Sequence, residues 1–120
     1  MKYKKIFVTG SGGFIGSHLV DKLLTEGYSV TALIKYNSNN DWGFLNKYKL
    51  QTNKKLKIIL GDVRDLPQMT CLIKGSDVVI HLAALIGIPY SYKAYNSYFD
   101  TNLTGTLNIL KSSIDNKIKR

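Results

Sequence analysis

Two patterns of apolar and polar positions alternate along this chain: short apolar runs, and apolar residues at helical spacing. The pair of patterns occurs four times. Short apolar runs bounded by glycines or polar turns predict β-strands at residues 4–9, 28–34, 56–60 and 77–81. After the first run, apolar residues recur at helical spacing up to Gly27, which is well placed to cap a helix. The stripe of this first helix consists of Phe14, Ile15, Leu19, Val20, Leu23 and Leu24.

Three more helices are predicted by the same reasoning. A short one spans residues 41–50, and another spans residues 65–75, with a proline in its first turn and a glycine at its end. An irregular stretch then runs through Tyr95, before a last helix over residues 98–113. We expect the apolar side of that helix to consist of Leu103, Leu107, Ile109, Leu110 and Ile114.

The order of strands and helices predicts one α/β domain, a Rossmann-type doubly wound parallel sheet with flanking helices. The sheet is expected to be incomplete, with about four strands in the order 3-2-1-4. The fourth strand then lies beside the first, and its other side is an open edge. Such an edge favours pairing with another chain, because its main-chain groups lack partners.

Composition narrows the class of protein. With 44% hydrophobic and 21% charged residues, the chain is typical of a globular domain. No apolar run approaches the roughly 18 residues that a membrane span needs, so no membrane association is expected. The basic start at residues 1–5 resembles a signal peptide, but glycines follow after a short apolar run. A cytoplasmic location is therefore expected.

Charge and cysteine content exclude two further classes of site. The net charge of +9 raises the question of nucleic acid, but only 2 of the 17 basic residues are arginines, and the lysines are scattered. We therefore expect a solvated lysine-rich surface and no nucleic-acid partner. The single cysteine, Cys71, has no disulfide or metal-ligand companion and is predicted to be a small buried apolar side chain. No metal site is expected.

A glycine-rich motif joins the first strand to the first helix. Gly10, Gly13 and Gly16 form GxxGxxG. In this context Gly10 permits a tight turn, Gly13 lets a pyrophosphate approach the backbone, and Gly16 lets the helix pack against the strand. The helix N-terminus adds unpaired amides and a partial positive charge. A P-loop is excluded, because the phosphate-binding lysine is missing, so the motif predicts a dinucleotide.

The end of the second strand bears on the choice between NAD and NADP. An acidic residue there accepts hydrogen bonds from the ribose hydroxyls of NAD, whereas a cation meets the 2′-phosphate of NADP. Here Lys35, Asn37 and Ser38 supply a cation with amide and hydroxyl donors, and the first acid is Asp41. The sequence favours NADP, while NAD stays open, because Lys35 can equally be interpreted as a surface lysine.

The third and fourth strands should also deliver residues to the cofactor, because ligands lie across the carboxyl ends of an open α/β sheet. Asp62 is placed either to accept a hydrogen bond from the adenine amino group or to cap the following helix. Ala83 and Ala84 leave room for a sugar or a ring. His81 and His18 are interpreted as structural histidines and not as catalysts.

Four segments together resemble the extended short-chain dehydrogenase/reductase superfamily and its NAD-dependent epimerase/dehydratase family. They are residues 9–19 (TGSGGFIGSHL), 61–65 (GDVRD), 81–84 (HLAA) and 101–106 (TNLTGT). The likeness covers essentially the whole chain in the right order. The shorter reductases of the superfamily would need glycine where Phe14 stands, so the extended group is indicated.

Within that group, residues 35–38, 41–43 and 85–92 resemble nucleotide-sugar 4,6-dehydratases, most of all N-acetylglucosamine nucleotide dehydratases of nonulosonic (legionaminic or related) acid pathways. The resemblance implies hydride transfer from hexose C4 to the cofactor, loss of water across C5 and C6, and return of the hydride to C6. It also implies a UDP- or GDP-N-acetylglucosamine-type substrate and a homodimeric parent protein. Nucleotide-sugar 4-epimerases share the first half of this cycle and stay open as an alternative.

The resemblance further implies a role for individual residues. The pyrophosphate would be met by Gly10, Gly13, Phe14 and Ile15. The adenine would be met by Asp62 and Val63. The floor under the ribose and nicotinamide would be Leu82, Ala83 and Ala84. The substrate side would hold Ile86, Gly87 and Tyr90. Asn102 resembles an asparagine that braces the active site.

One departure from the family concerns catalysis. The family's proton transfers come from Tyr-x-x-x-Lys, a helical spacing that places the lysine beside the tyrosine and lowers the tyrosine pKa. None of the eight tyrosines in this chain is followed four positions later by lysine. We therefore expect residues 1–120 to be the N-terminal part of an NAD(P)-binding domain, without the substrate domain and without turnover on its own. A non-catalytic dinucleotide-binding module is the remaining alternative.

Overall fold

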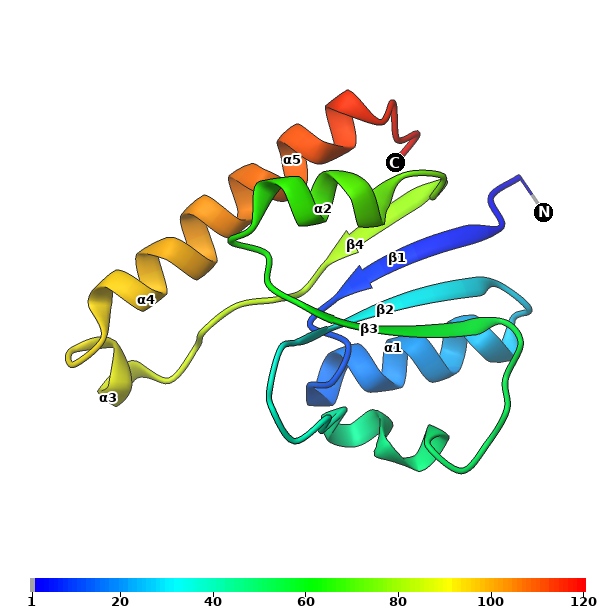
Figure 1. The fold of residues 1–120 in the computed structure, drawn as a ribbon, viewed down its shortest axis with the longest axis horizontal. Helices are drawn as coiled ribbons and strands as arrows, with labels where there is room; N and C mark the ends of the chain where they lie inside the picture. The colour runs from blue at the N-terminus through cyan, green and yellow to red at the C-terminus, as the bar shows by residue number, and fades with distance from the viewer. Residues whose placement is uncertain (1) are drawn as a thin grey trace.

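A parallel sheet of four strands carries the fold in the computed structural model, which describes residues 2–120 (Figure 1). The strands are β1 (Lys5–Thr9), β2 (Ser29–Lys35), β3 (Leu56–Gly61) and β4 (Val78–His81). Their spatial order is β3-β2-β1-β4, and all three pairings are parallel. The predicted order 3-2-1-4 is confirmed, and the carboxyl ends of the strands meet at one edge of the sheet.

Helices cover both faces of this sheet and extend beyond its carboxyl edge. The helices of the chain are α1 (Phe14–Thr25), the 3-10 helix η1 (Gly43–Tyr48), α2 (Leu66–Ile73), α3 (Ile88–Ser91), α4 (Tyr95–Phe99), the π-helix η2 (Asp100–Thr104) and α5 (Gly105–Asp115). Helices α1 and η1 lie on one face, and α2 and α5 lie on the other (Figure 1). Within residues 2–120, no helix has the length and apolar character needed to cross a bilayer.

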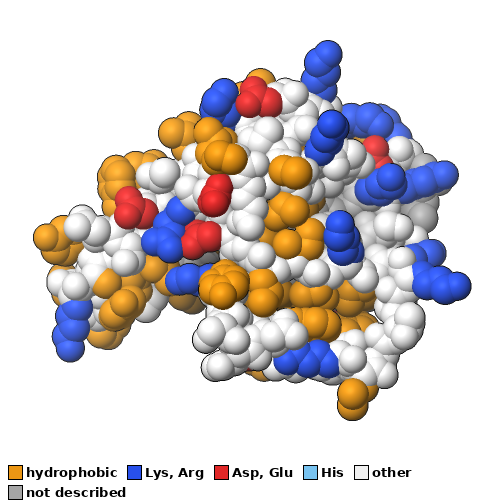
Figure 2. All heavy atoms as spheres, viewed as in Figure 1, with side chains coloured by type: hydrophobic (Ala, Val, Ile, Leu, Met, Phe, Trp, Pro, Cys, Tyr) orange, Lys and Arg blue, Asp and Glu red, His pale blue; other side chains and the backbone are white. Residues whose placement is uncertain are grey.

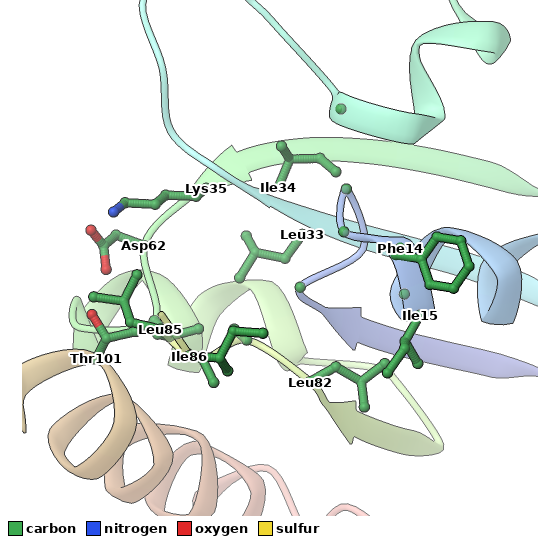
Figure 3. A pocket seen from close by; sticks show the side chains of 18 of the residues that line it. Phe14, Ile15, Leu33, Ile34, Lys35, Asp62, Leu82, Leu85, Ile86 and Thr101 are labelled. Carbon is green, nitrogen blue, oxygen red and sulfur yellow. The ribbon is translucent and has the colours of Figure 1, made fainter. Parts of the chain in front are cut away.

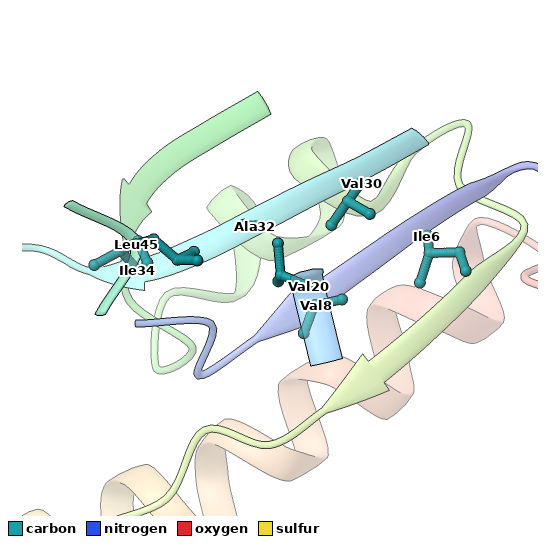
Figure 4. Packing of buried hydrophobic residues seen from close by; sticks show 7 residues of the cluster. All are labelled: Ile6, Val8, Val20, Val30, Ala32, Ile34 and Leu45. Atoms are coloured by element: carbon teal, nitrogen blue, oxygen red, sulfur yellow. The ribbon is translucent and has the colours of Figure 1, made fainter. Parts of the chain in front are cut away.

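Alternating side chains of the strands build two separate cores. Ile6 and Val8 of β1 are buried with Val20 of α1 and Leu45 of η1 on one face (Figure 4). Phe7, which lies between them in sequence, is fully buried on the other face, in a second core with residues of α2 and α5. This two-residue period is what a strand covered on both faces requires.

Two features of the last helix differ from the sequence prediction. The helical region begins at Tyr95 and reaches Asp115, and a helical turn, α3, interrupts the stretch expected to be irregular. The helix also packs through three small or polar residues, Gly105, Asn108 and Ser112, with Ile109 as the one large apolar side chain that is buried. A Cβ at Gly105 would lie 2.7 Å from Val63 Cγ2, so the small residue allows close packing.

The prediction of the apolar side of this helix is therefore wrong for four of its five residues. Only Ile109 is buried, whereas the remaining side chains are 56–75% exposed; these are Leu103, Leu107, Leu110 and Ile114. The helix has an outward apolar stripe and an inward polar one, and periodicity alone does not reveal which side meets the sheet. Asn108 satisfies its inward position by donating to the Val63 carbonyl at 3.1 Å.

One other prediction of burial also needs correction. Cys71 is exposed, because α2 buries Met69 and Ile73, and a residue midway between two positions four apart lies on the opposite side. Phe14 and Ile15, which belong to the apolar stripe of α1, are 66% and 71% exposed. They lie in the first turn, beyond the part of the helix that packs on the sheet.

The outer edge of β4 is partly paired and not fully open as predicted. The chain turns at Lys117, where φ is +53°, and its last residues return along β4. Lys119 donates its amide to the Asp77 carbonyl at 3.3 Å, and Val79 donates its amide to the Arg120 carbonyl at 2.9 Å. The end of the chain thereby satisfies main-chain groups at the start of the edge.

Candidate functional site

A cavity of about 660 Å³ opens at the carboxyl edge of the sheet. Its walls come from the carboxyl ends of the strands and the segments that follow them: Gly10, residues 12–16, 33–35, 61–63 and 82–86, together with Gly43 of η1 and Thr101 of η2. Figure 3 shows Lys35 and Asp62 at one end of the cavity and Phe14 and Ile15 at the other. The site predicted from the strand ends is thus a single continuous space.

The glycine loop owes its shape to backbone contacts. Gly10 has a φ of +67°, and a Cβ there would lie 2.8 Å from the Ala83 amide nitrogen. A Cβ at Gly16 would lie 2.1 Å from the Gly10 carbonyl oxygen. At Gly13, however, the nearest atom would be 3.4 Å away, so the fold itself tolerates a methyl group there. The missing side chain at Gly13 keeps the surface beside the helix N-terminus open.

The first turn of α1 is free to receive an anion. Gly13 is its N-cap and offers no side chain, and among residues 2–120 no side chain caps this helix. No acidic residue lies in the first turn either. The first-turn amides and the positive end of the helix dipole therefore face the cavity without a protein partner.

Gly43, at the start of η1, packs against Gly12 of the glycine loop, and neither glycine was predicted to contribute to the site. Gly43 has a φ of +59°, and a Cβ there would lie 2.4 Å from the Gly12 carbonyl oxygen. The same carbonyl accepts the Phe44 amide at 3.0 Å. A glycine in the first turn of the predicted 41–50 helix was the available signal. The start of η1 therefore supports the glycine loop.

Asp62 holds a salt bridge at the end of β3. Its carboxylate accepts hydrogen bonds from the Arg64 guanidinium, at 2.6 Å from Nη2, and from the Arg64 amide at 2.9 Å. The Arg64 guanidinium holds the pKa of Asp62 below its ordinary value, and Asp62 raises the pKa of Arg64. The alternative that Asp62 caps the next helix is wrong, because Asp65 accepts the Gln68 amide and is the N-cap of α2.

Of the three residues predicted to select the cofactor, Lys35 lines the cavity, whereas Asn37 and Ser38 do not. Lys35 lines the cavity, close enough to Asp62 for its charge to help lower the pKa of that carboxyl. Asn37 instead closes its own loop: its side chain accepts the Asp41 amide and donates to the Asp41 carbonyl, both at 2.7 Å. Ser38 is exposed outside the lining. A contact of Asn37 or Ser38 with a cofactor stays a prediction.

The loop after β4 is held at its start by Thr9. The buried Thr9 Oγ1 accepts the amides of Leu82 and Ala83, each at 3.0 Å, and lies 2.8 Å from His81 Nδ1. His81 Nε2 lies 3.0 Å from Thr106 Oγ1 on α5. Both ring nitrogens have partners, as expected of a structural histidine, and burial lowers the pKa of His81.

Asn102 holds the same loop at its other end. Its side chain accepts the Leu85 amide at 2.8 Å and donates to the Leu85 carbonyl at 2.9 Å. It therefore braces the cavity wall without lining it. Gly87 and Tyr90 also lie outside the lining, where the Tyr98 hydroxyl donates to the Gly87 carbonyl and the Tyr90 and Tyr98 rings lie 6.0 Å apart.

Most of the predicted site residues line the cavity: Gly10, Gly13, Phe14, Ile15, Gly16, Lys35, Asp62, Val63, Leu82, Ala83, Ala84 and Ile86. Gly61, in the segment predicted to line the crevice at the end of the third strand, also lines it, whereas six further lining residues were not predicted: Gly12, Leu33, Ile34, Gly43, Leu85 and Thr101. Several of these adjoin predicted residues at strand ends. Thr101 does not lie at a strand end. It reaches the cavity from the π-helix η2, which the sequence pattern did not predict. Among residues 2–120, no group of three His, Cys, Asp or Glu side chains is gathered to hold a metal.

Comparison with known proteins shows which family this chain resembles in sequence. The family model described as GDP-mannose 4,6 dehydratase matches residues 7–120. UDP-N-acetyl-alpha-D-glucosaminuronate decarboxylase of Bacillus cytotoxicus is 34% identical over 116 residues, which are 97% of this chain and 35% of that protein. These matches confirm the resemblance drawn from the four sequence segments.

Solved structures agree with the fold. DesIV of Streptomyces venezuelae, a dTDP-glucose 4,6-dehydratase solved with NAD and TYD bound, superposes with a TM-score of 0.84 at 28% identity. The match covers 97% of this chain and 37% of DesIV. The UDP-N-acetylglucosamine 4-epimerase of Methanobrevibacter ruminantium M1, in complex with UDP-N-acetylmuramic acid, superposes with a TM-score of 0.82 at 34% identity, over 99% of this chain and 36% of the epimerase. The chain thus spans about a third of the length of these relatives.

Proposed function

The chain belongs to the GDP-mannose 4,6-dehydratase family, within the extended short-chain dehydrogenase/reductases, and on that premise we propose that its cavity binds NAD or NADP for a nucleotide-sugar enzyme. The bound nicotinamide would supply a hydride acceptor and donor, and this chain would supply the binding surface.

The observation that carries the proposal is the uncapped N-terminus of α1 beside Gly13. Gly13 is a position where the fold tolerates a methyl group and the chain has none, so a glycine there suits close approach of a pyrophosphate. In the same cavity, Asp62 and Val63 would receive the adenine. Leu82, Ala83 and Ala84 would lie under the nicotinamide ribose. Binding of dinucleotide to the purified chain, measured by isothermal titration calorimetry, tests the proposal.

We propose NADP as the preferred cofactor. Lys35 lines the end of the cavity next to Asp62, and no carboxylate follows β2 before Asp41. The ion pair between Asp62 and Arg64 leaves Lys35 as the cation available to a 2′-phosphate at this rim.

Lys35→Ala is therefore expected to weaken NADP binding roughly tenfold and NAD binding much less, the size of a lost charged hydrogen bond. Titrating both cofactors into the variant measures the difference. Lys57→Ala, a lysine on the neighbouring strand that is absent from the cavity lining, is the control. Equal losses for NAD and NADP would contradict the NADP assignment.

We propose a 4,6-dehydratase acting on a UDP- or GDP-N-acetylglucosamine-type substrate as the reaction of the parent protein, with a 4-epimerase as the second candidate. The decarboxylase and the epimerase named above, whose substrates or ligands are UDP-linked N-acetyl sugars, support the substrate class. Ile86 lines the cavity, and Gly87 and Tyr90 follow it on the segment that would approach the sugar. We also propose a homodimeric parent and a cytoplasmic location.

The 120-residue chain alone is expected to bind cofactor and to turn over no nucleotide sugar, because it contains no Tyr-x-x-x-Lys pair. Mass spectrometry of the sugar nucleotide after incubation checks this. With a longer parent, a product lighter by one water would support the dehydratase, and an isomer of unchanged mass would support the epimerase. Turnover by the 120-residue chain would contradict the expectation.

A further inference from the structure

The hydrogen-bond partners of the Thr9 hydroxyl fix the direction in which its proton points. Its oxygen accepts the amides of Leu82 and Ala83, each at 3.0 Å, and a hydroxyl oxygen has two acceptor sites. Thr9 is fully buried, so water does not compete for these positions. The hydroxyl proton therefore points to the third partner, His81 Nδ1, at 2.8 Å.

The direction of this bond determines the state of the imidazole. Because Nδ1 accepts a hydrogen bond from the Thr9 hydroxyl, it carries no proton of its own, and the neutral ring bears its proton on Nε2. Nε2 then donates to Thr106 Oγ1 at 3.0 Å. Thr106 in turn donates its hydroxyl to the Asn102 carbonyl at 2.6 Å, so every donor in the chain has one acceptor.

This chain of hydrogen bonds holds both ends of residues 82–85, the part of the loop after β4 that forms the floor of the cavity. One end holds the amides of Leu82 and Ala83 against β1, and the other end reaches Asn102, whose side chain holds Leu85. The imidazole of His81 is the link between β1 and the π-helix. Residues 82–85 are thus tied at both ends to groups that His81 connects.

We propose that His81 is a positioning residue: as a neutral imidazole with its proton on Nε2 it holds the floor at residues 82–85, and its protonation releases that floor. Since those residues line the cavity, we infer that protonation also weakens dinucleotide binding, an inference that rests on the proposed function. A proton on Nδ1 would face the Thr9 oxygen, whose acceptor sites are already filled by two amides. Either the amides of Leu82 and Ala83 or the imidazole of His81 must then lose its hydrogen bond to Thr9 Oγ1.

The surroundings of His81 agree with a neutral ring. The groups that face it are the Thr9 hydroxyl from β1 and the Thr106 hydroxyl from α5, and both are uncharged. The ring is half-buried, and burial lowers its pKa. The neutral form therefore dominates at pH 7.5, and protonation follows as the pH falls below the ordinary histidine range.

The test begins with nuclear magnetic resonance of the unliganded chain labelled with nitrogen-15. His18, the other histidine, is exposed on α1 and serves as the internal control. We expect His81 to show the Nε2-protonated tautomer at pH 7.5. The amide signals of Leu82 and Ala83 should shift with the titration of His81 and not with that of His18. An Nδ1-protonated tautomer, or floor amides that ignore His81, would overturn the proposal.

Two variants of Thr106 separate positioning from general stability. Thr106→Val keeps the shape of the side chain but removes the acceptor of His81 Nε2, and Thr106→Ser restores it. We expect Thr106→Val to weaken NADP binding roughly tenfold at pH 7.5, and Thr106→Ser to bind like the unchanged protein. Equal binding by Thr106→Val and the unchanged protein would count against the proposal.

The pH dependence of binding separates this inference from the proposed function. We expect dinucleotide binding, measured with NADP and with NAD, to weaken as the pH falls through the His81 titration that nuclear magnetic resonance records. Constant binding of both cofactors across that titration would overturn the inference and leave the proposed function intact. Absence of binding on both sides of the titration, with the floor amides still following His81, would refute the proposed function and support the positioning role.

Discussion

Gly13 and Gly16 stand three residues apart, yet a methyl group would meet different surroundings at each. At Gly16 it would lie 2.1 Å from a backbone oxygen that cannot move without opening the loop, and at Gly13 it would lie 3.4 Å away, near ordinary contact. The fold therefore requires glycine at position 16 but does not require it at position 13. A glycine that the fold does not require indicates that a ligand approaches the backbone there.

We expect Gly13→Ala to keep the thermal stability of the chain, with a Tm within roughly 3 °C of the original, and to lose at least about tenfold in NADP affinity. Gly16→Ala is expected to unfold the loop and to lower the Tm markedly, because the Gly10 carbonyl blocks the new methyl group. Calorimetry of unfolding and of binding measures both effects. If Gly13→Ala bound NADP normally, the pyrophosphate would have to lie elsewhere.

At the scale of single elements, Asp77 joins three segments at the amino end of β4. Its Oδ2 accepts the amides of Lys4 and Lys5, at 2.9 and 3.0 Å, and its Oδ1 accepts Lys119 Nζ at 3.1 Å. The two backbone amides and then Lys119 lower the pKa of Asp77 to about 2. The start of β1, the start of β4 and the end of the chain thereby share one carboxylate.

Asp77→Asn is expected to lower the Tm at pH 7, by a margin that disappears in acid. In the unfolded chain the carboxyl has an ordinary pKa near 3.8, so between there and about 2 the unfolded state binds more protons. The stabilisation by Asp77 is therefore complete above about pH 4 and is lost as the pH falls through about 2. Thermal unfolding between pH 2 and pH 7 measures this. Asp115→Asn, which removes an exposed pair with Lys111, is the control and should change the Tm little.

At the scale of the whole molecule, the exposed apolar stripe along η2 and α5 is the feature that packing against the four-stranded sheet leaves unexplained. Leu103, Leu107, Leu110 and Ile114 follow one another at spacings of four, three and four residues. That spacing forms a seam of the kind along which helices pair. Further exposed apolar side chains lie on α3 and α4, and Figure 2 shows hydrophobic side chains gathered where these two helices lie in the same view. Exposed apolar side chains that lie together in this way are typical of an interaction surface.

The double variant Leu107→Lys with Leu110→Lys is expected to reduce self-association of the chain, because both side chains are exposed and neither belongs to a buried core. Sedimentation velocity over a range of concentrations measures the effect. Lys74→Glu, at the C-cap of α2, is a control that changes charge away from the stripe. Concentration-dependent association that persists in the double variant would mean that another surface, such as the edge of β4, is responsible.

The amino-acid sequence alone determined the order of the elements, the strand order and most of the cavity lining. These depend on local rules: apolar periodicity, glycine at a strand-to-helix turn, and the direction of parallel crossovers. Gly10, Lys35 and Asp62 were found because they follow strands, and in a parallel sheet every strand end reaches the same edge.

Only the tertiary structure decided which face of a helix is buried and which polar groups meet. The outward stripe of α5, the exposure of Cys71 and the position of Asn37 depend on partners distant in sequence. The link from Thr9 through His81 to Thr106 joins residues 72 and 25 positions apart. Sequence periodicity describes one helix or strand at a time, whereas burial and hydrogen-bond direction are properties of the groups that packing brings together.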